Sequence, residues 1–109
     1  MNEETGISAR ISSEQRNKIV SNEAIRKSGL NGYNARQHFA VAARISIVWK
    51  HATLVKARSD REGDGNVASI KRFAAPLLLD SKPAVAYMTA KESVEHGHRI
   101  YSLELREAR

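Results

Sequence analysis

Apolar residues recur at helical spacing in the first part of the chain. Ile11 and Ile19 share one side of a helix, and Val20, Ala24 and Ile25 widen this apolar stripe. Ser12 can accept a hydrogen bond from a free backbone N–H, and Gln15 follows three positions later, as in a capping box. Gly29 can adopt the left-handed conformation that ends many helices. The pattern predicts a first helix over residues 13–28.

A second helix is predicted over residues 35–51. Asn34 is a suitable N-cap, and Gln37 follows it by three residues. The segment is apolar on several sides, at Phe39, Ala40, Val41, Ala42, Ala43, Ile45, Ile47, Val48 and Trp49. Such a helix is usually buried in a core or an interface. The apolar residues of 45–49 also alternate, so a strand is a competing interpretation there.

After residue 51 the pattern changes to β-favouring segments separated by turns. The strand candidates are residues 52–55, 67–79, 84–91 and 99–105. We expect a polar loop at 59–66, and turns at 80–83 and 95–98. Two helices followed by strands with short connections predict an α+β domain whose sheet is a four-stranded antiparallel meander.

The chain length of 109 residues fits a single domain. Within it we expect residues 1–10 to be flexible, 11–51 to be helical and 52–107 to form the sheet. Alternation predicts one shared face for Val85, Tyr87, Thr89 and Lys91. In the last strand it predicts that Tyr101, Leu103 and Leu105 lie opposite Ile100, Ser102 and Glu104.

Composition restricts the classes of function. The chain has 18 Lys and Arg residues against 12 Asp and Glu, a net charge of +6, and no cysteine. Without cysteine there is no disulfide scaffold, thiolate metal site or cysteine nucleophile. No apolar run approaches the ~18–20 residues of a membrane span, and no secretory signal is seen. We expect a cytoplasmic protein without a membrane partner, whose basic excess favours either a polyanion or simply solubility.

The sequence predicts no metal and no cofactor. An alternation of acidic residues that starts at Asp60 resembles a calcium loop, but its twelfth position is Lys71 rather than the closing carboxylate. His96 and His98 are too few for a closed zinc site without cysteine. Phosphate loops, nucleophile elbows and zinc-protease motifs are also missing from the sequence.

Cations and hydroxyls fall on predicted strands rather than at loop tips. They are Lys71, Arg72, Thr89, Lys91 and Tyr101. On a concave sheet face these groups could hold a phosphodiester, stabilise charge on its oxygens and move protons. Alternatively, they are half-exposed strand positions whose Lys and Arg stems cover apolar surface. Spacing leaves both interpretations open.

Several short segments carry a family resemblance. They are ATLV at 52–55, DR at 60–61, NVASIKRFAAP at 66–76, MTAKE at 88–92 and IYSLE at 100–104. In this order they resemble the large polyvalent protein-associated domains of phages and mobile elements, which are related to the phage barnase–EndoU–colicin–RelE-like nucleases. The resemblance spans residues 44–107. It implies helices followed by an antiparallel sheet and, for members that act as nucleases, metal-independent cleavage of RNA on the sheet face.

The resemblance also implies site residues. By position, the catalytic candidates are Arg72, Thr89, Lys91 and Tyr101. The candidates for contact with nucleic acid or a partner are His51, Lys56, Arg58, Lys71 and Arg72. A histidine often precedes the Arg-Phe pair in such sequences, and here that position is Lys71. This departure could remove a general base.

Three functions therefore compete. The first is a small ribonuclease or toxin-like domain that acts on RNA without a metal. The second is a non-catalytic phage-encoded protein that binds and inhibits a nuclease or defence complex in the bacterial host cell. The third is an oligomeric accessory domain for nucleic-acid binding, in which residues 35–50 supply the interface between copies.

Overall fold

The computed structural model describes residues 2–10, 13–58, 67–93 and 97–108. In these parts of the chain, a short β1 (Ala9–Arg10) precedes the helices α1 (Ser13–Ile19), α2 (Asn22–Leu30), α3 (Ala35–Ala42) and α4 (Ile45–His51). The strands β2 (Thr53–Arg58), β3 (Val67–Leu79), β4 (Lys82–Ser93) and β5 (Gly97–Glu107) follow. The predicted α+β class is confirmed. The predicted loop at 59–66 lies outside the described residues.

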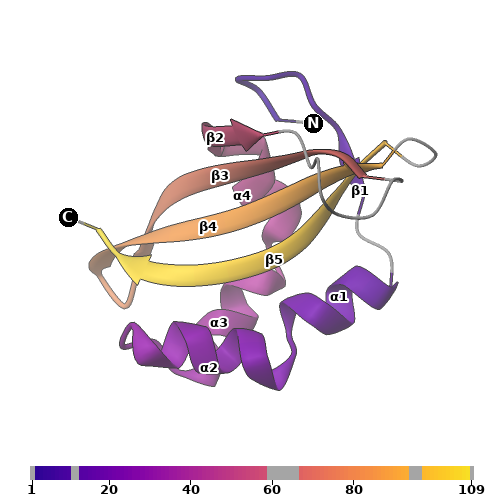
Figure 1. Ribbon diagram of the computed structural model, residues 1–109. Helices are drawn as coiled ribbons and strands as arrows, with labels where there is room; N and C mark the ends of the chain where they lie inside the picture. The colour runs from indigo at the N-terminus through magenta and orange to yellow at the C-terminus, as the bar shows by residue number, and fades with distance from the viewer. Residues whose placement is uncertain (1, 11–12, 59–66, 94–96, 109) are drawn as a thin grey trace.

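The sheet has the strand order β1-β5-β4-β3-β2. From β2 to β5 each strand pairs antiparallel with the next, which confirms the meander, and β1 adds a parallel pair to β5. In Figure 1 the strands β3 and β4 cross in front of α4, and the other helices lie below the sheet. We call the face that packs against the helices the helix-side face, and the other the open face.

Each predicted helix is divided into two in the described residues. The first is interrupted at Ser21, whose side chain caps α2 by accepting a hydrogen bond from the Ala24 N–H at 3.2 Å. Gly32, with φ of +94°, follows α2, whereas the predicted terminator Gly29 lies inside that helix. The capping box predicted at Ser12 lies outside the described residues.

The second predicted helix begins as expected and breaks later. Asn34 and Gln37 form the predicted capping box, with reciprocal bonds of 2.9 and 3.0 Å. The residues of α4 resolve the competition between helix and strand, because Ile45 and Trp49 are buried while Ile47 is 61% exposed. Burial at a spacing of four residues is the helical pattern.

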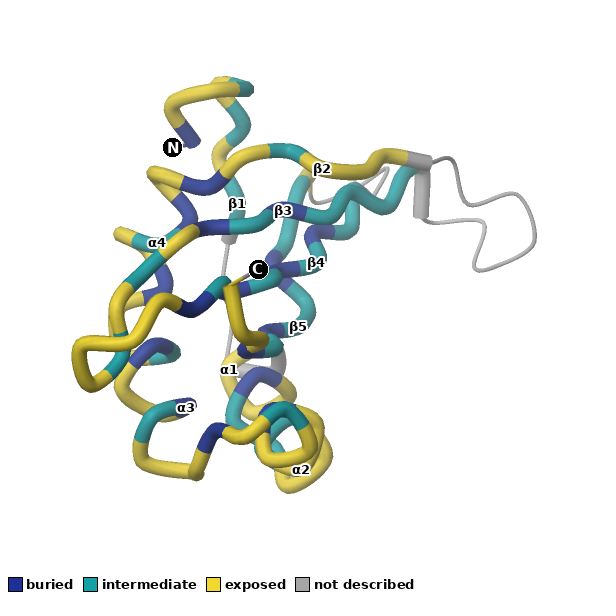
Figure 2. The backbone as a smooth tube through the Cα atoms, turned by 90° about the vertical axis from the view of Figure 1, so that its left-hand side faces the viewer, coloured by how far each residue is buried: buried dark blue, intermediate teal, exposed yellow. Residues whose placement is uncertain are grey.

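The hydrophobic core lies between the helices and the helix-side face, as the buried segments in Figure 2 show. In β4 the buried positions are Ala84, Ala86, Met88 and Ala90. Three of these four are alanines, so the helices can approach the sheet closely. Large side chains fill the remaining space, and the rings of Trp49 and Phe73 pack with centroids 4.3 Å apart.

Two hydrogen-bond networks fix the helices. Buried His38 bonds through Nε2 to the Ile19 carbonyl at 2.6 Å and through Nδ1 to the Ser28 hydroxyl at 2.8 Å. A carbonyl only accepts, so Nε2 carries the proton and His38 holds α1, α2 and α3 together. At the N-terminus, Asn2 Nδ2 donates to the carbonyls of Trp49 at 2.7 Å and Ala52 at 2.8 Å, where α4 ends.

The β3–β4 hairpin follows the local chemistry of the sequence. Asp80 and Ser81 both have positive φ, as a two-residue turn of type I′ requires. Pro76 is tolerated in β3 because the pairing with β2 stops at Ala74.

Among the helices in the described part of the chain, none combines the length and apolar character needed to cross a membrane.

Candidate functional site

The open face carries the predicted β4 residues. Alternation holds along this strand, so Val85, Tyr87, Thr89 and Lys91 are half-buried on the face opposite the core. Arg72 of β3 pairs with Thr89, and Ser102 of β5 pairs with Thr89 from the other side. Paired residues share a face, so the register aligns three polar side chains across the open face.

Tyr101 reaches the open face through a β-bulge. Thr89 pairs with Ser102, but the next residue, Ala90, pairs with Ile100, which leaves Tyr101 as the extra residue of β5. Beyond it Leu103 and Leu105 are buried, as is Ile100 before it. The predicted faces are therefore right for residues 102–105 and wrong for Ile100 and Tyr101, because the bulge shifts the alternation by one. Ile100 joins the two leucines in the core.

The phenol of Tyr101 lies between two ammonium groups. Lys18 of α1 donates to its oxygen at 2.8 Å and lies 4.1 Å from the ring centroid. Lys91 Nζ lies over the same ring, 3.6 Å from the centroid. The hydrogen bond from Lys18, with the charges of Lys91 and Lys18, lowers the pKa of Tyr101 below its ordinary 10.0, although burial acts to raise it.

Arg72 stands beside this pair. Its guanidinium lies 4.8 Å from the Tyr87 ring centroid and 3.4 Å from a carboxylate oxygen of Glu104. On its other side a hollow of about 270 Å³ is lined by Lys56, Ile70, Arg72 and Thr89. We call Lys18, Arg72, Thr89, Lys91 and Tyr101 the open-face cluster. Its chemistry suits an anion, because cations and hydroxyls converge on one surface.

Lys71 lies on the opposite face from its neighbour Arg72. In β3 it lies two residues before buried Phe73 and therefore on the same face, and it pairs with buried Ala90. Its ammonium donates to the Ser69 hydroxyl at 2.8 Å and lies 3.1 Å from His98 Nε2. Lys71, which stands where related sequences often have a histidine, therefore lies on the helix-side face.

Glu92 completes a second polar group around Lys71. One carboxylate oxygen accepts from Ser69 at 3.2 Å, and the other lies 3.5 Å from His98 Nε2. Desolvation, followed by the charge of Lys71, lowers the pKa of His98 below its ordinary 6.5, while Glu92 acts in the opposite direction. We call Ser69, Lys71, Glu92 and His98 the helix-side cluster. The cluster holds one lysine and one carboxylate, and both contact Ser69 and His98.

The other predicted contact residues are dispersed. Lys56 is exposed at the hollow beside Arg72. His51 ends α4 on the helix side, where its Nδ1 lies 3.5 Å from a carboxylate oxygen of Glu3. The side chain of Arg58 lies outside the described residues. Sequence reasoning missed Lys18, because it is 83 residues from Tyr101 along the chain and carries no motif.

The described residues contain no group of three His, Cys, Asp or Glu side chains that could hold a metal ion. Asp60 and His96, which the sequence analysis considered as ligands, lie outside those residues. Ser28 and His38 resemble a nucleophile–base pair at 2.8 Å, but both are fully buried. A substrate cannot reach them, so the open-face cluster is the candidate site.

The fold and this site define a class: an α+β domain with a helix-packed antiparallel sheet whose opposite face carries a cluster of cations and hydroxyls. The family model for large polyvalent protein-associated domain 3 matches residues 1–101. The chain belongs to that family, which confirms the resemblance to phage and mobile-element polyvalent proteins and extends it to the helices. No curated protein and no solved structure matches the chain.

Proposed function

We propose that the open-face cluster binds the phosphodiester of RNA and cleaves it without a metal. The observation that carries the proposal is a phenol of lowered pKa held between Lys18 and Lys91, with Arg72 on the same face. A proton acceptor beside fixed cations is what transfer of a phosphoryl group to a neighbouring hydroxyl requires. The substrate is RNA of a bacterial host, so we expect the domain to act in the cytoplasm of that cell.

In the proposed reaction, the phenolate of Tyr101 accepts the proton of the ribose 2′ hydroxyl. The 2′ oxygen attacks phosphorus, and the bond from phosphorus to the 5′ oxygen breaks. An ammonium group of the cluster returns a proton to the 5′ oxygen, so the products are a 2′,3′-cyclic phosphate and a 5′ hydroxyl. Arg72 and the hydroxyl of Thr89 bind the non-bridging oxygens, whose negative charge grows in the transition state.

The test is incubation of the purified protein with total RNA in EDTA, followed by analysis of fragment ends. We expect cyclic phosphate ends from the native protein, and at least a ~100-fold lower rate for Lys91→Ala and for Arg72→Ala. Lys82→Ala is the matched control, because Lys82 is exposed at the β3–β4 turn. Cleavage that persists in both variants would contradict the assignment of these residues.

A second candidate is a non-catalytic domain that binds RNA or a host protein complex. The observation that favours it is Glu104, which engages Arg72 at 3.4 Å and Arg106 at 2.6 Å and so weakens the cationic field of the face. Salt-sensitive RNA binding without fragments would support binding alone. A stable host protein captured through the open face, in competition with RNA, would support inhibition.

A third candidate is an oligomeric accessory domain for nucleic-acid binding, with residues 35–50 as the interface between copies. The structure turns Val41, Ile45 and Trp49 towards the sheet, so the apolar surface left on these helices includes Phe39, 46% exposed, and Ile47, 61% exposed. Light scattering of the native protein and of Ile47→Ser tests this interface. A native monomer would remove it.

A further inference from the structure

A cavity of about 660 Å³ opens on the helix side of the molecule, away from the open-face cluster. It lies between α1, α3 and α4 and the end of the sheet formed by β1 and β5. Its floor belongs to the core, because Ile19, Trp49 and Ile100 line it and each is at most 2% exposed. The volume is within the ~300–1,000 Å³ range of small-molecule sites.

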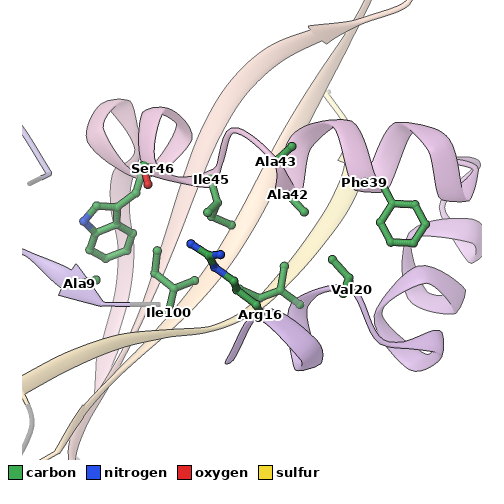
Figure 3. A pocket seen from close by; sticks show the side chains of 11 residues that line it. Ala9, Arg16, Val20, Phe39, Ala42, Ala43, Ile45, Ser46 and Ile100 are labelled. Carbon is green, nitrogen blue, oxygen red and sulfur yellow. The ribbon is translucent and has the colours of Figure 1, made fainter. Parts of the chain in front are cut away.

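Among the described residues that line this cavity, Arg16 has the one charged side chain. In Figure 3 its guanidinium points towards the apolar side chains of Ile45 and Ile100. Within the described part of the chain, no carboxylate lies within ion-pair distance of Arg16. Among the described lining residues the other polar side-chain groups are the Ser46 hydroxyl, at the margin, and the Trp49 N–H, which donates to the Ile7 carbonyl at 3.1 Å. In the described part of the chain, the cavity thus combines an apolar floor with one positive charge, that of Arg16, which has no carboxylate partner there.

We propose that this cavity binds a small amphipathic carboxylate, with its apolar chain or ring on the core floor and its carboxylate on Arg16. A guanidinium binds a carboxylate through two parallel hydrogen bonds, and this pairing strengthens where apolar walls exclude water. Burial of the chain supplies the remaining affinity. One cation over apolar walls does not suit a polyanion such as RNA, so the site is independent of the function proposed for the open face.

Trp49 provides a built-in probe, since it is the only tryptophan of the chain and lines the cavity floor. Octanoate is titrated into the full-length protein, below the concentration at which it forms micelles, while the emission of Trp49 and the heat of binding are recorded. We expect saturable binding at one site, and at least ~10-fold weaker binding of octanol, which lacks the charge.

Variants of the protein test the contribution of the Arg16 charge and that of the apolar lining one at a time. Arg16→Gln is expected to weaken octanoate at least ~10-fold, to the level of octanol, whereas Arg26→Gln on the exposed side of α2 should change it by less than ~2-fold. Ala43→Phe places a ring in the cavity and should block both ligands. Circular dichroism checks that each variant is folded.

Three results would overturn the proposal. The first is octanoate binding that is equal in the native protein and Arg16→Gln. The second is no saturable binding at all. The third is a concentration-dependent dimer that Ala43→Phe abolishes, since a second copy of the chain would then fill the cavity. Sedimentation of the native protein and this variant decides that last outcome.

Discussion

The open-face cluster and the helix-side cluster lie on opposite faces of the same strands and differ in how their charges are balanced. In the helix-side cluster, Lys71 contacts Ser69 and His98, and Glu92 lies within 3.5 Å of His98. In the open-face cluster, Lys91 lies on the Tyr101 ring, and no described carboxylate is within ion-pair distance of it. In the open-face cluster Arg72 is paired with Glu104, so among the described residues it is Lys91 that can still neutralise an anion.

The two clusters also differ in what a lowered pKa does to the charge of their rings, Tyr101 and His98. Cations lower the pKa of Tyr101 because they favour the phenolate, so its anion forms nearer to neutral pH. Burial and a cation lower the pKa of His98 because they disfavour the imidazolium, so its neutral form persists to lower pH. A shift in the same direction thus creates a charge on one face and suppresses a charge on the other.

The largest expected effect is a difference in the free energy of unfolding between substitutions at two consecutive residues, Arg72 and Phe73. Phe73 is fully buried against Trp49, so Phe73→Ala should lower the free energy of unfolding by about 3–5 kcal/mol. Arg72 lies on the open face in a half-buried ion pair with Glu104, so Arg72→Ala should cost only about 1 kcal/mol. Denaturant unfolding of both variants measures the difference. Equal losses would mean that the open face is also part of the core.

The second prediction concerns activity on the two faces. Tyr101→Phe keeps the ring but removes the hydroxyl, and should reduce RNA cleavage at least ~100-fold. Lys71→Ala on the helix-side face should change the rate by less than ~3-fold, because its ammonium contacts Ser69 and His98 of that cluster rather than the open face. Rates are measured on one defined RNA in EDTA. If Lys71→Ala lowers the cleavage rate as much as Tyr101→Phe does, the reaction takes place on the helix-side face instead.

Most elements of the fold could be predicted from local pattern. The Asn34–Gln37 capping box, the turn at Asp80 and the alternation of β4 all depend on neighbours within a few residues. The division of both helices was missed, because the apolar stripe continues through each break. Ser21 is a strong N-cap by type, and this was the available signal.

The candidate site was only partly predictable, for two physical reasons. The bulge at Tyr101 depends on how β4 and β5 pair, and no residue type announces it. Lys18 joins the cluster only when α1 packs beside β5. By contrast, the separation of Lys71 from Arg72 was available from period-two alternation, since Lys71 has the parity of the apolar residue Phe73.

The third prediction tests the source of the Tyr101 pKa. Lys18→Met removes the hydrogen-bond donor that lowers it most, so the pKa of Tyr101 should rise towards 10.0. Lys91→Met should raise it by a smaller amount, because this lysine contributes mainly charge. Carbon NMR of labelled tyrosine, titrated with base, follows the phenol directly. An unchanged pKa in both variants would show that the two lysines do not stabilise the phenolate.

The smallest effect is a pH dependence of stability from the helix-side cluster. The pKa of His98 is lower in the folded protein than its ordinary 6.5, so between these two values the unfolded chain binds more protons. The free energy of unfolding should therefore be highest above pH 6.5 and fall as the pH drops towards the folded-state pKa. His98→Gln should flatten this part of the profile, measured by urea unfolding between about pH 5 and 8. His51→Gln is the matched control, since His51 is exposed at the end of α4. An unaltered slope in His98→Gln would mean that folding does not change the proton affinity of His98, despite its contacts with Lys71 and Glu92. The two faces would then differ in charge balance but not in the titration of their rings.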